Sequence, residues 1–239
     1  MSRFLTTAAM VALGIFLLTS CGNSPVQHTV KHKIRQQETT GSCWLASLRM
    51  IVETYKNVEV KECTLYNEIN NFYGGGMAAY DCCAKPTLEP DLQALVCGRG
   101  GMLPEIYALM DLVLELDYKQ FSRALTWEEV KSSIDNGFLI MSLMSHPLYG
   151  SAHAHIISGY VERDGKHFLV ISETTLGMVI ELEYEKYLGT GRSVWEMSFV
   201  FTMEKSPTPS CNMVFGDLIC VKNTKTPNLI DRIKAFFDL

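Results

Sequence analysis

The stretch QETTGSCWLAS at residues 37–47 leads from polar sequence into an apolar segment that continues to residue 56. Within 43–56 the apolar side chains recur at helical spacing, which predicts an amphipathic helix with Cys43 in its first turn. A cysteine is nucleophilic as its thiolate, and a helix N-terminus favours that form through unpaired N–H groups and the helix dipole. The stretch therefore predicts a helix that begins with a candidate nucleophile.

A thiolate that attacks a carbonyl needs a donor for the developing oxyanion and a base for its own proton. Gln37, six residues before Cys43, is the candidate donor, together with the backbone N–H of Cys43. His153 opens the run HAHIISGY and is the candidate base. His155 is the alternative base, because residues two apart on a strand share a face.

A carboxylate beside the imidazole would hold it in the productive tautomer. Glu173 ends the run FLVISE, which returns towards the start of the preceding strand through the Asp164-Gly165 turn. Asp164 is the alternative acid, but it lies in the turn, away from the start of that strand. Glu173 is therefore the candidate orienting residue.

The sequence changes in character at Phe138. Before it, helical spacing predicts further helices at 62–71, 88–96, 104–115 and 127–135. After it, runs typical of strands follow: FLIMSLM, HAHIISGYVE, HFLVISE, MVIELEY, VWEMSFVFTME and a pair that flanks Gly216-Asp217. Helices followed by antiparallel strands predict an α+β fold. Apolar residues between 229 and 237 predict one more amphipathic helix, packed on the body.

These segments resemble the papain-like cysteine peptidase superfamily, and within it the bacterial branch related to the bacteriocin-processing leader peptidases. The matching residues are Gln37 with GSCWLAS, His153 followed by Gly159-Tyr160, and FLVISE. The resemblance implies a helical N-terminal half whose nucleophile helix packs on a C-terminal antiparallel sheet. It also favours Gln37 over Gln36 and His153 over His155. The cysteine that papain has three positions before its nucleophile is Thr40 here, so that disulfide is not expected.

The first twenty residues predict export. Arg3 precedes the apolar run AAMVALGIFLL (residues 8–18), which is short for a bilayer span and typical of a signal peptide. Residues 18–21, Leu-Thr-Ser-Cys, resemble the lipobox of bacterial lipoproteins, which implies cleavage before Cys21 and its lipidation. An ordinary signal peptide with a chance cysteine is the alternative. Residues 21–33 are polar and predict a flexible tether, so that 34–239 form the peptidase domain.

Six of the eight cysteines remain once Cys21 and Cys43 are set aside. An even number in an exported protein predicts disulfides. Cys211 and Cys220 flank a predicted turn and form the first candidate pair. The other four candidates can form two bridges with three connectivities: Cys63, Cys82, Cys83 and Cys97. A zinc site is the alternative for them, although no closely spaced C-x₂₋₄-C pair is present.

The composition limits the classes of partner. The 239 residues include 21 basic and 26 acidic side chains, a formal charge of −5, and 47% of them are hydrophobic. This composition is typical of a globular protein, and the excess of acid argues against nucleic-acid binding. We expect a monomer that acts on peptide or protein substrates and contacts the bilayer through the lipid on Cys21.

The sequence thus predicts a lipid-anchored cysteine peptidase of the bacterial cell envelope, at the outer membrane or the periplasmic face. Its Cys-His-Glu triad would act through a thioester and need no cofactor. One alternative is a thiol transferase or cell-wall amidase on the same fold. Another is a catalytically inactive surface-binding lipoprotein, and the presence of both Cys43 and His153 argues against it. The identity of the substrate does not follow from the sequence.

Overall fold

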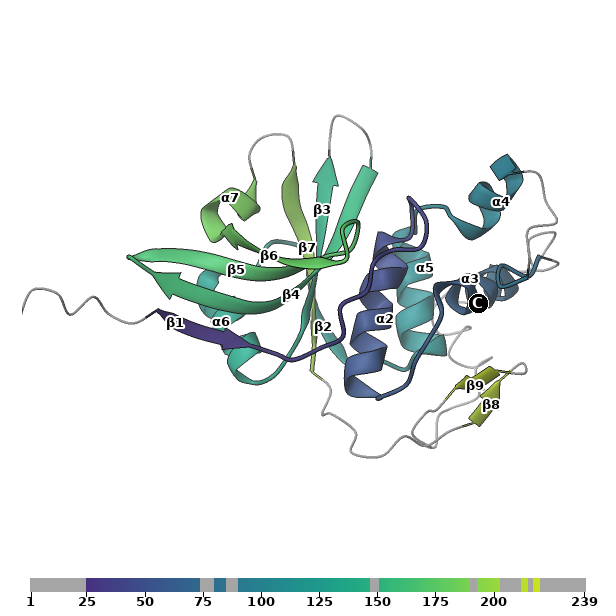
Figure 1. Ribbon diagram of the computed structural model, residues 1–239, viewed down its shortest axis with the longest axis horizontal. Helices are drawn as coiled ribbons and strands as arrows, with labels where there is room; N and C mark the ends of the chain where they lie inside the picture. Colours follow the sequence, from purple (N-terminus) through teal and green to yellow (C-terminus); the bar gives the residue numbers. More distant parts are fainter. Residues whose placement is uncertain are drawn as a thin grey trace, which may run out of the picture.

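The computed structural model describes residues 25–73, 80–84, 90–146, 151–189, 193–202, 212–214 and 217–219. Within these ranges the chain forms a mainly helical half followed by a half built on an antiparallel sheet (Figure 1). The predicted α+β class is confirmed.

Six α-helices and one π-helical turn lie in the described ranges: α2 (Cys43–Tyr55), α3 (Glu62–Tyr73), α4 (Pro90–Cys97), α5 (Leu103–Ala108), η2 (Leu109–Val113), α6 (Trp127–Asp135) and α7 (Tyr184–Leu188). The predicted helices are present, but the one expected at 104–115 changes to π-type hydrogen bonding, with the Leu114 N–H donating to the Leu109 carbonyl. At the start of α6, Thr126 and Glu129 form a capping box.

Helix α2 is buried on nearly every side, including its polar residues Arg49 and Glu53. These two form an ion pair one helical turn apart, with 3.1 Å between Arg49 Nε and Glu53 Oε1. The pair is extended by Arg35 to Glu53 at 2.8 Å and by Arg49 to Glu38 at 2.9 Å. Because buried charges need partners, this network fixes residues 35–38 against α2, just before the nucleophile loop.

The main sheet has seven strands and contains β1 (Val26–Thr29), β2 (Tyr118–Phe121), β3 (Ile140–His146), β4 (Ser151–Arg163), β5 (Lys166–Glu173), β6 (Met178–Glu183) and β7 (Val194–Phe201). Its order is β2-β7-β3-β4-β5-β6, and β1 pairs with β4. The β4–β5 hairpin turns at Asp164 and Gly165, which both have positive φ. Its register places Ile156 opposite Ser172, so the start of β4 lies near the end of β5.

Strand β1 corrects one expectation, because the tether predicted for 21–33 is wrong at these residues. All four side chains of β1 are exposed, so the strand leaves no alternating apolar pattern in the sequence. It is held by backbone pairing, in which Thr29 lies opposite Gly159. A Cβ on Gly159 would lie 2.5 Å from Thr29 Cγ2, so the close approach requires glycine. His28 also contacts Asp135 of α6 at 2.6 Å.

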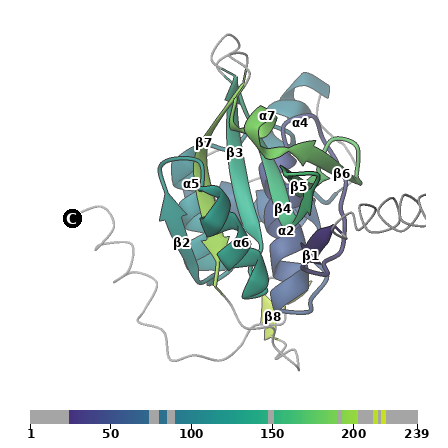
Figure 2. The same cartoon turned by 90° about the vertical axis from the view of Figure 1, so that its left-hand side faces the viewer.

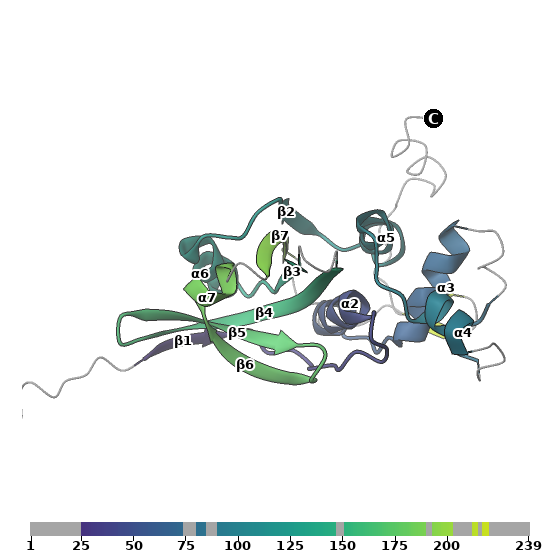
Figure 3. The same ribbon diagram turned by 90° about the horizontal axis from the view of Figure 1, so that it is seen from above.

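The layers place α2 at the centre of the molecule. Seen from above, α2 lies between the strands and the helices α3 and α4 (Figure 3). In the view of Figure 2, α6 and α7 lie in front of the strands and α2 lies behind them. At the C-terminal end of α2, the buried Tyr55 hydroxyl accepts the Leu139 N–H at 2.6 Å and donates to the Gly137 carbonyl at 3.2 Å. These bonds tie α2 to the start of β3.

Two disulfides join α3, residues 80–84 and α4. They link Cys63 to Cys83 and Cys82 to Cys97, one of the three connectivities that the sequence leaves open. Their formation excludes the zinc alternative for these four cysteines.

Several predictions lie outside the described residues: the signal peptide 1–20, Cys21, the pair Cys211 and Cys220, and the helix at 229–237. The short strands β8 (Asn212–Val214) and β9 (Asp217–Ile219) do pair, as expected around their turn. Among the described helices, none combines the length and the apolar character needed to cross a bilayer.

Candidate active site

The nucleophile loop places Cys43 as the first residue of α2. The Ser42 hydroxyl donates to the Thr39 carbonyl and accepts the Thr39 N–H, each at 3.0 Å, which closes the turn before the helix. A Cβ on Gly41 would lie 2.3 Å from the Gly98 carbonyl oxygen, so only glycine fits where this loop packs on residues 98–100. Local sequence therefore fixes the thiol at the helix N-terminus. Among the described residues, Cys43 is the only cysteine outside a disulfide.

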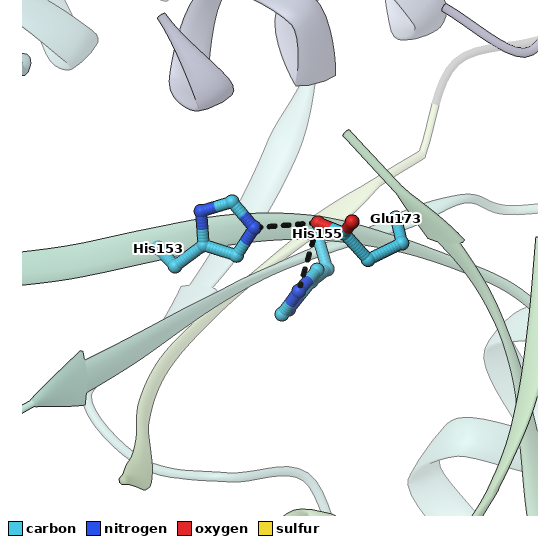
Figure 4. A group of neighbouring side chains, drawn as sticks. All are labelled: His153, His155 and Glu173. Atoms are coloured by element: carbon cyan, nitrogen blue, oxygen red, sulfur yellow. Dashed lines mark hydrogen bonds and ion pairs between the residues drawn. The ribbon is translucent and has the colours of Figure 1, made fainter. Parts of the chain in front are cut away.

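His153 and Glu173 lie side by side at adjoining ends of β4 and β5 (Figure 4). His153 Nε2 is 2.7 Å from Glu173 Oε1, and both side chains are mostly buried. Glu173 also accepts two backbone N–H groups, from Thr175 at 3.0 Å and from Leu176 at 2.9 Å. Burial raises the pKa of Glu173, but the hydrogen bonds from His153 and these N–H groups outweigh it and hold the pKa below its usual value.

Cys43 also acts electrostatically on the same histidine. Burial disfavours the charged imidazole, but the hydrogen bond and charge of Cys43, together with those of Glu173, outweigh it and raise the pKa of His153. Since Nε2 of His153 is directed at Glu173, Nδ1 is left for the thiol. The structure thus brings the three predicted residues together at one site.

His155 lies beside His153, with ring centroids 4.4 Å apart, but its surroundings differ. Its Nδ1 is 2.9 Å from the Tyr187 hydroxyl, and its Nε2 is 3.8 Å from Glu173 Oε1. Burial, with the neighbouring charge of His153, lowers the pKa of His155 to about 3. It is therefore neutral at ordinary pH, and its Nδ1 is engaged by Tyr187, which favours His153 as the base.

Gln37 lies in the loop before Cys43, but both atoms of its side-chain amide already form hydrogen bonds within the protein. Gln37 Nε2 donates to the carbonyls of Thr39 at 2.8 Å and Thr40 at 2.9 Å, and Gln37 Oε1 accepts from the Thr174 hydroxyl at 3.3 Å. These bonds connect the loop to the end of β5. The role of Gln37 as an oxyanion donor stays a prediction.

A cleft of about 790 Å³ opens over Cys43 and His153, between the helical and sheet halves. Its helical wall includes Gly100, Gly101 and Leu103, and its sheet wall includes Leu143. A Cβ on Gly101 would lie 2.5 Å from the Trp44 ring, so this wall requires glycine. Nothing in the sequence pattern led us to expect this wall, although the run GRGG at 98–101 is a signal for a close approach of the backbone.

The arrangement suits nucleophilic attack on a carbonyl by a thiolate, with proton transfer through imidazole. It also brings together potential metal ligands, because one donor atom each from His153, His155 and Glu173 lies within 4.8 Å of the others.

No protein-family model matches the chain, and no curated protein matches it. Among solved structures the chain is similar to one described as the structural basis for the limited antibody cross reactivity between the mite allergens Blo t 1 and Der p 1. The identity is 14%, the match covers 77% of this chain and 73% of that chain, and the TM-score is 0.43. A likeness at this level supports no statement about family or activity, so the resemblance to papain rests on the sequence motifs alone.

Proposed function

We propose that this chain is a cysteine peptidase of papain-like fold that hydrolyses peptide bonds through a thioester on Cys43. One observation carries the proposal. Cys43 begins a buried helix and lines the same cleft as His153, whose Nε2 is 2.7 Å from Glu173 Oε1.

In the first half of the reaction, His153 Nδ1 takes the proton of Cys43 and leaves an ion pair of thiolate and imidazolium. The raised pKa of His153 supports this charge separation. The thiolate attacks the carbonyl carbon of the scissile bond, and the electron pair moves to the carbonyl oxygen. The tetrahedral intermediate then collapses, His153 protonates the departing amine, and the acyl group remains on the sulfur.

The oxyanion needs donors that are already in place. The backbone N–H of Cys43 qualifies, because the first N–H groups of a helix have no partner within the helix. Gln37 would supply the second donor by exchanging its hydrogen bond to the Thr40 carbonyl for one to the oxyanion.

In the second half, His153 removes a proton from water, and the resulting hydroxide attacks the thioester. Collapse of this second intermediate releases the carboxylic acid and restores the thiolate. Protein side chains and water supply every proton and electron pair, so the mechanism needs no cofactor. Glu173 keeps the imidazole oriented through both halves.

The proposed location is the outside of a bacterial cytoplasmic membrane, with a lipid on Cys21 as anchor. The signal-like residues 1–20 support this, and the two disulfides are in keeping with an oxidising compartment. If the lipid is the anchor, Cys21→Ala moves the protein from the detergent phase to the aqueous phase in a detergent partition and leaves the reactivity of Cys43 unchanged. Retention of the variant in the detergent phase would mean that another segment holds it.

The test of function is incubation of the purified chain with a mixed peptide library and with peptidoglycan fragments, followed by mass spectrometry of the products. A peptidase yields shortened peptides with free termini, and Cys43→Ala yields none. New amide-linked products would indicate a transferase, and products from peptidoglycan alone an amidase. No Cys43-dependent product from either mixture would refute the hydrolase and favour the inactive binding protein.

A further inference from the structure

The proposed mechanism uses His153 and Glu173 but gives no task to His155, a mostly buried imidazole beside them (Figure 4). We propose that His153, His155 and Glu173 form a site for one divalent transition-metal ion, best matched by Zn²⁺, and that the bound ion stops His153 from acting as a base. Metal binding at this site does not depend on the proposed function. The inhibition does, because it rests on His153 being the base in the proposed function.

The geometry is close to that of a zinc site. The Oε1 atom of Glu173 is 2.7 Å from His153 Nε2 and 3.8 Å from His155 Nε2. Zinc bonds of about 2.0–2.2 Å in tetrahedral geometry separate neighbouring ligand atoms by roughly 3.3 Å. One of these separations must therefore lengthen by about 0.6 Å and the other shorten by about 0.5 Å. The third, between the donor nitrogens of the two histidines, is within 4.8 Å and must also close towards about 3.3 Å when the ion binds. Water would take the fourth position.

Hydrogen bonds around the three side chains already resemble those that orient metal ligands. His155 Nδ1 is 2.9 Å from the Tyr187 hydroxyl, which is itself 2.5 Å from Ser142 Oγ. If the Nδ1–H of His155 donates to Tyr187, its Nε2 lone pair faces Glu173. The backbone N–H groups after Glu173 hold the carboxylate from the other side.

The donor set favours particular metals. Two imidazole nitrogens and one carboxylate suit zinc and similar transition metals, whereas calcium and magnesium prefer oxygen ligands alone. The side chains keep limited contact with solvent, with exposed fractions of 23% for His153, 14% for His155 and 12% for Glu173. An ion can therefore reach them while most of their surroundings stay fixed.

The consequence for His153 follows from its two nitrogens. A neutral imidazole carries one proton, and an ion on Nε2 takes the lone pair there and breaks the hydrogen bond to Glu173. The single proton then resides on Nδ1, the nitrogen that acts as the base in the proposed mechanism. Nδ1 has no lone pair left to accept the proton of Cys43, so thiolate formation is suppressed.

The main alternative places the ion on the Cys43 thiolate, and two measurements separate the sites. The first is competition for Zn²⁺ between the protein and a chromogenic chelator, with Cys43→Ala and His155→Ala as matched variants. Our site predicts that Cys43→Ala binds Zn²⁺ as tightly as the unmodified chain, whereas His155→Ala, which lacks a ligand, binds at least about 10²-fold more weakly. The reverse order would overturn the proposal, as would no binding by the unmodified chain.

The second measurement is the absorption spectrum of the Co²⁺-loaded protein. Ligation by nitrogen and oxygen gives no sulfur-to-cobalt charge-transfer band, and the appearance of that band would refute the site. If His155→Ala fails to fold, the spectrum of the unmodified chain still distinguishes this site from one that includes the Cys43 thiolate. Tyr187→Phe also leaves the ligands intact and removes only the hydroxyl next to His155, so we expect a smaller loss of affinity, of about tenfold.

Inhibition is read from the rate at which an epoxide alkylates Cys43, with and without saturating Zn²⁺, so that no peptide substrate is needed. We expect a rate at least tenfold lower with Zn²⁺ in the unmodified chain and an unchanged rate in His155→Ala at the same concentration. Binding that requires His155 but leaves the alkylation rate unchanged would contradict the role of His153 in the proposed function. Absence of binding contradicts only the metal site.

Discussion

Glu173→Gln isolates the charge of the third member of the triad. Glutamine keeps the length of the side chain and can still accept a hydrogen bond from His153 through its amide oxygen. Its NH₂ group would then face the Leu176 N–H, which now donates to Glu173 Oε2 at 2.9 Å. The substitution therefore converts a charge-assisted hydrogen bond into a neutral one.

The magnitude follows from that conversion. A hydrogen bond to a charged group contributes about 1.5–3 kcal/mol and a neutral one about 0.5–1.5 kcal/mol, a difference of roughly 1–1.5 kcal/mol. At about 1.4 kcal/mol per factor of ten, the rate of thiolate chemistry falls about 5- to 13-fold. Loss of the base in His153→Ala costs more, about 10²-fold or greater, because general-base catalysis itself is removed.

The assay is the second-order rate constant for inactivation of Cys43 by a thiol-directed epoxide. Glu181→Gln is the matched control, because it removes an exposed carboxylate from the adjacent strand β6. Denaturation in urea checks that each variant is folded. If Glu173→Gln loses as much reactivity as His153→Ala, or none at all, the assigned orienting role is refuted.

Three further predictions concern the base, the β1 contact and the disulfides. Reactivity of Cys43 falls less in His155→Ala than in His153→Ala, and the opposite order in the epoxide assay would reverse the two assignments. Gly159→Val pushes the β1 backbone off β4 and lowers the free energy of unfolding by about 1–3 kcal/mol, measured in urea; an unchanged midpoint would show that β1 does not contribute. The disulfide between Cys82 and Cys97 joins residues 15 apart in the sequence, and its removal in the double variant Cys82→Ser/Cys97→Ser lowers the free energy of unfolding by about 3 kcal/mol. A loss of less than about 1 kcal/mol would contradict the structural role of this disulfide.

Periodicity and turn residues predict the main elements of the fold well. Helix α2, the capping box before α6 and the β4–β5 hairpin each follow from local sequence, because their apolar spacing or turn chemistry is distinctive. Strand β1 and helix α7 cannot be predicted from the local sequence. β1 has no buried face and depends on a distant glycine, and α7 has five residues, too few to show a helical period.

The candidate site, too, can be predicted from the sequence only in part. The sequence predicts that Cys43, His153 and Glu173 meet, because a hairpin brings the last two together and the resemblance to papain-like peptidases relates them to the first. It does not predict that His155 is held neutral, since this depends on burial and on Tyr187. Nor does it predict that the side-chain amide of Gln37 donates hydrogen bonds to two backbone carbonyls. Both features arise from tertiary contacts between segments far apart in the chain.

Activation of Cys43 by His153 underlies the whole proposed mechanism. The most direct test is the rate at which a thiol-directed epoxide labels Cys43 at mildly acidic pH, where ordinary thiols are protonated, with the labelled residue identified by mass spectrometry. We expect Cys43 of the unmodified chain to react at least about 10²-fold faster than Cys43 of His153→Ala. Equal rates in the two proteins, or no labelling of Cys43 in the folded chain, would contradict it.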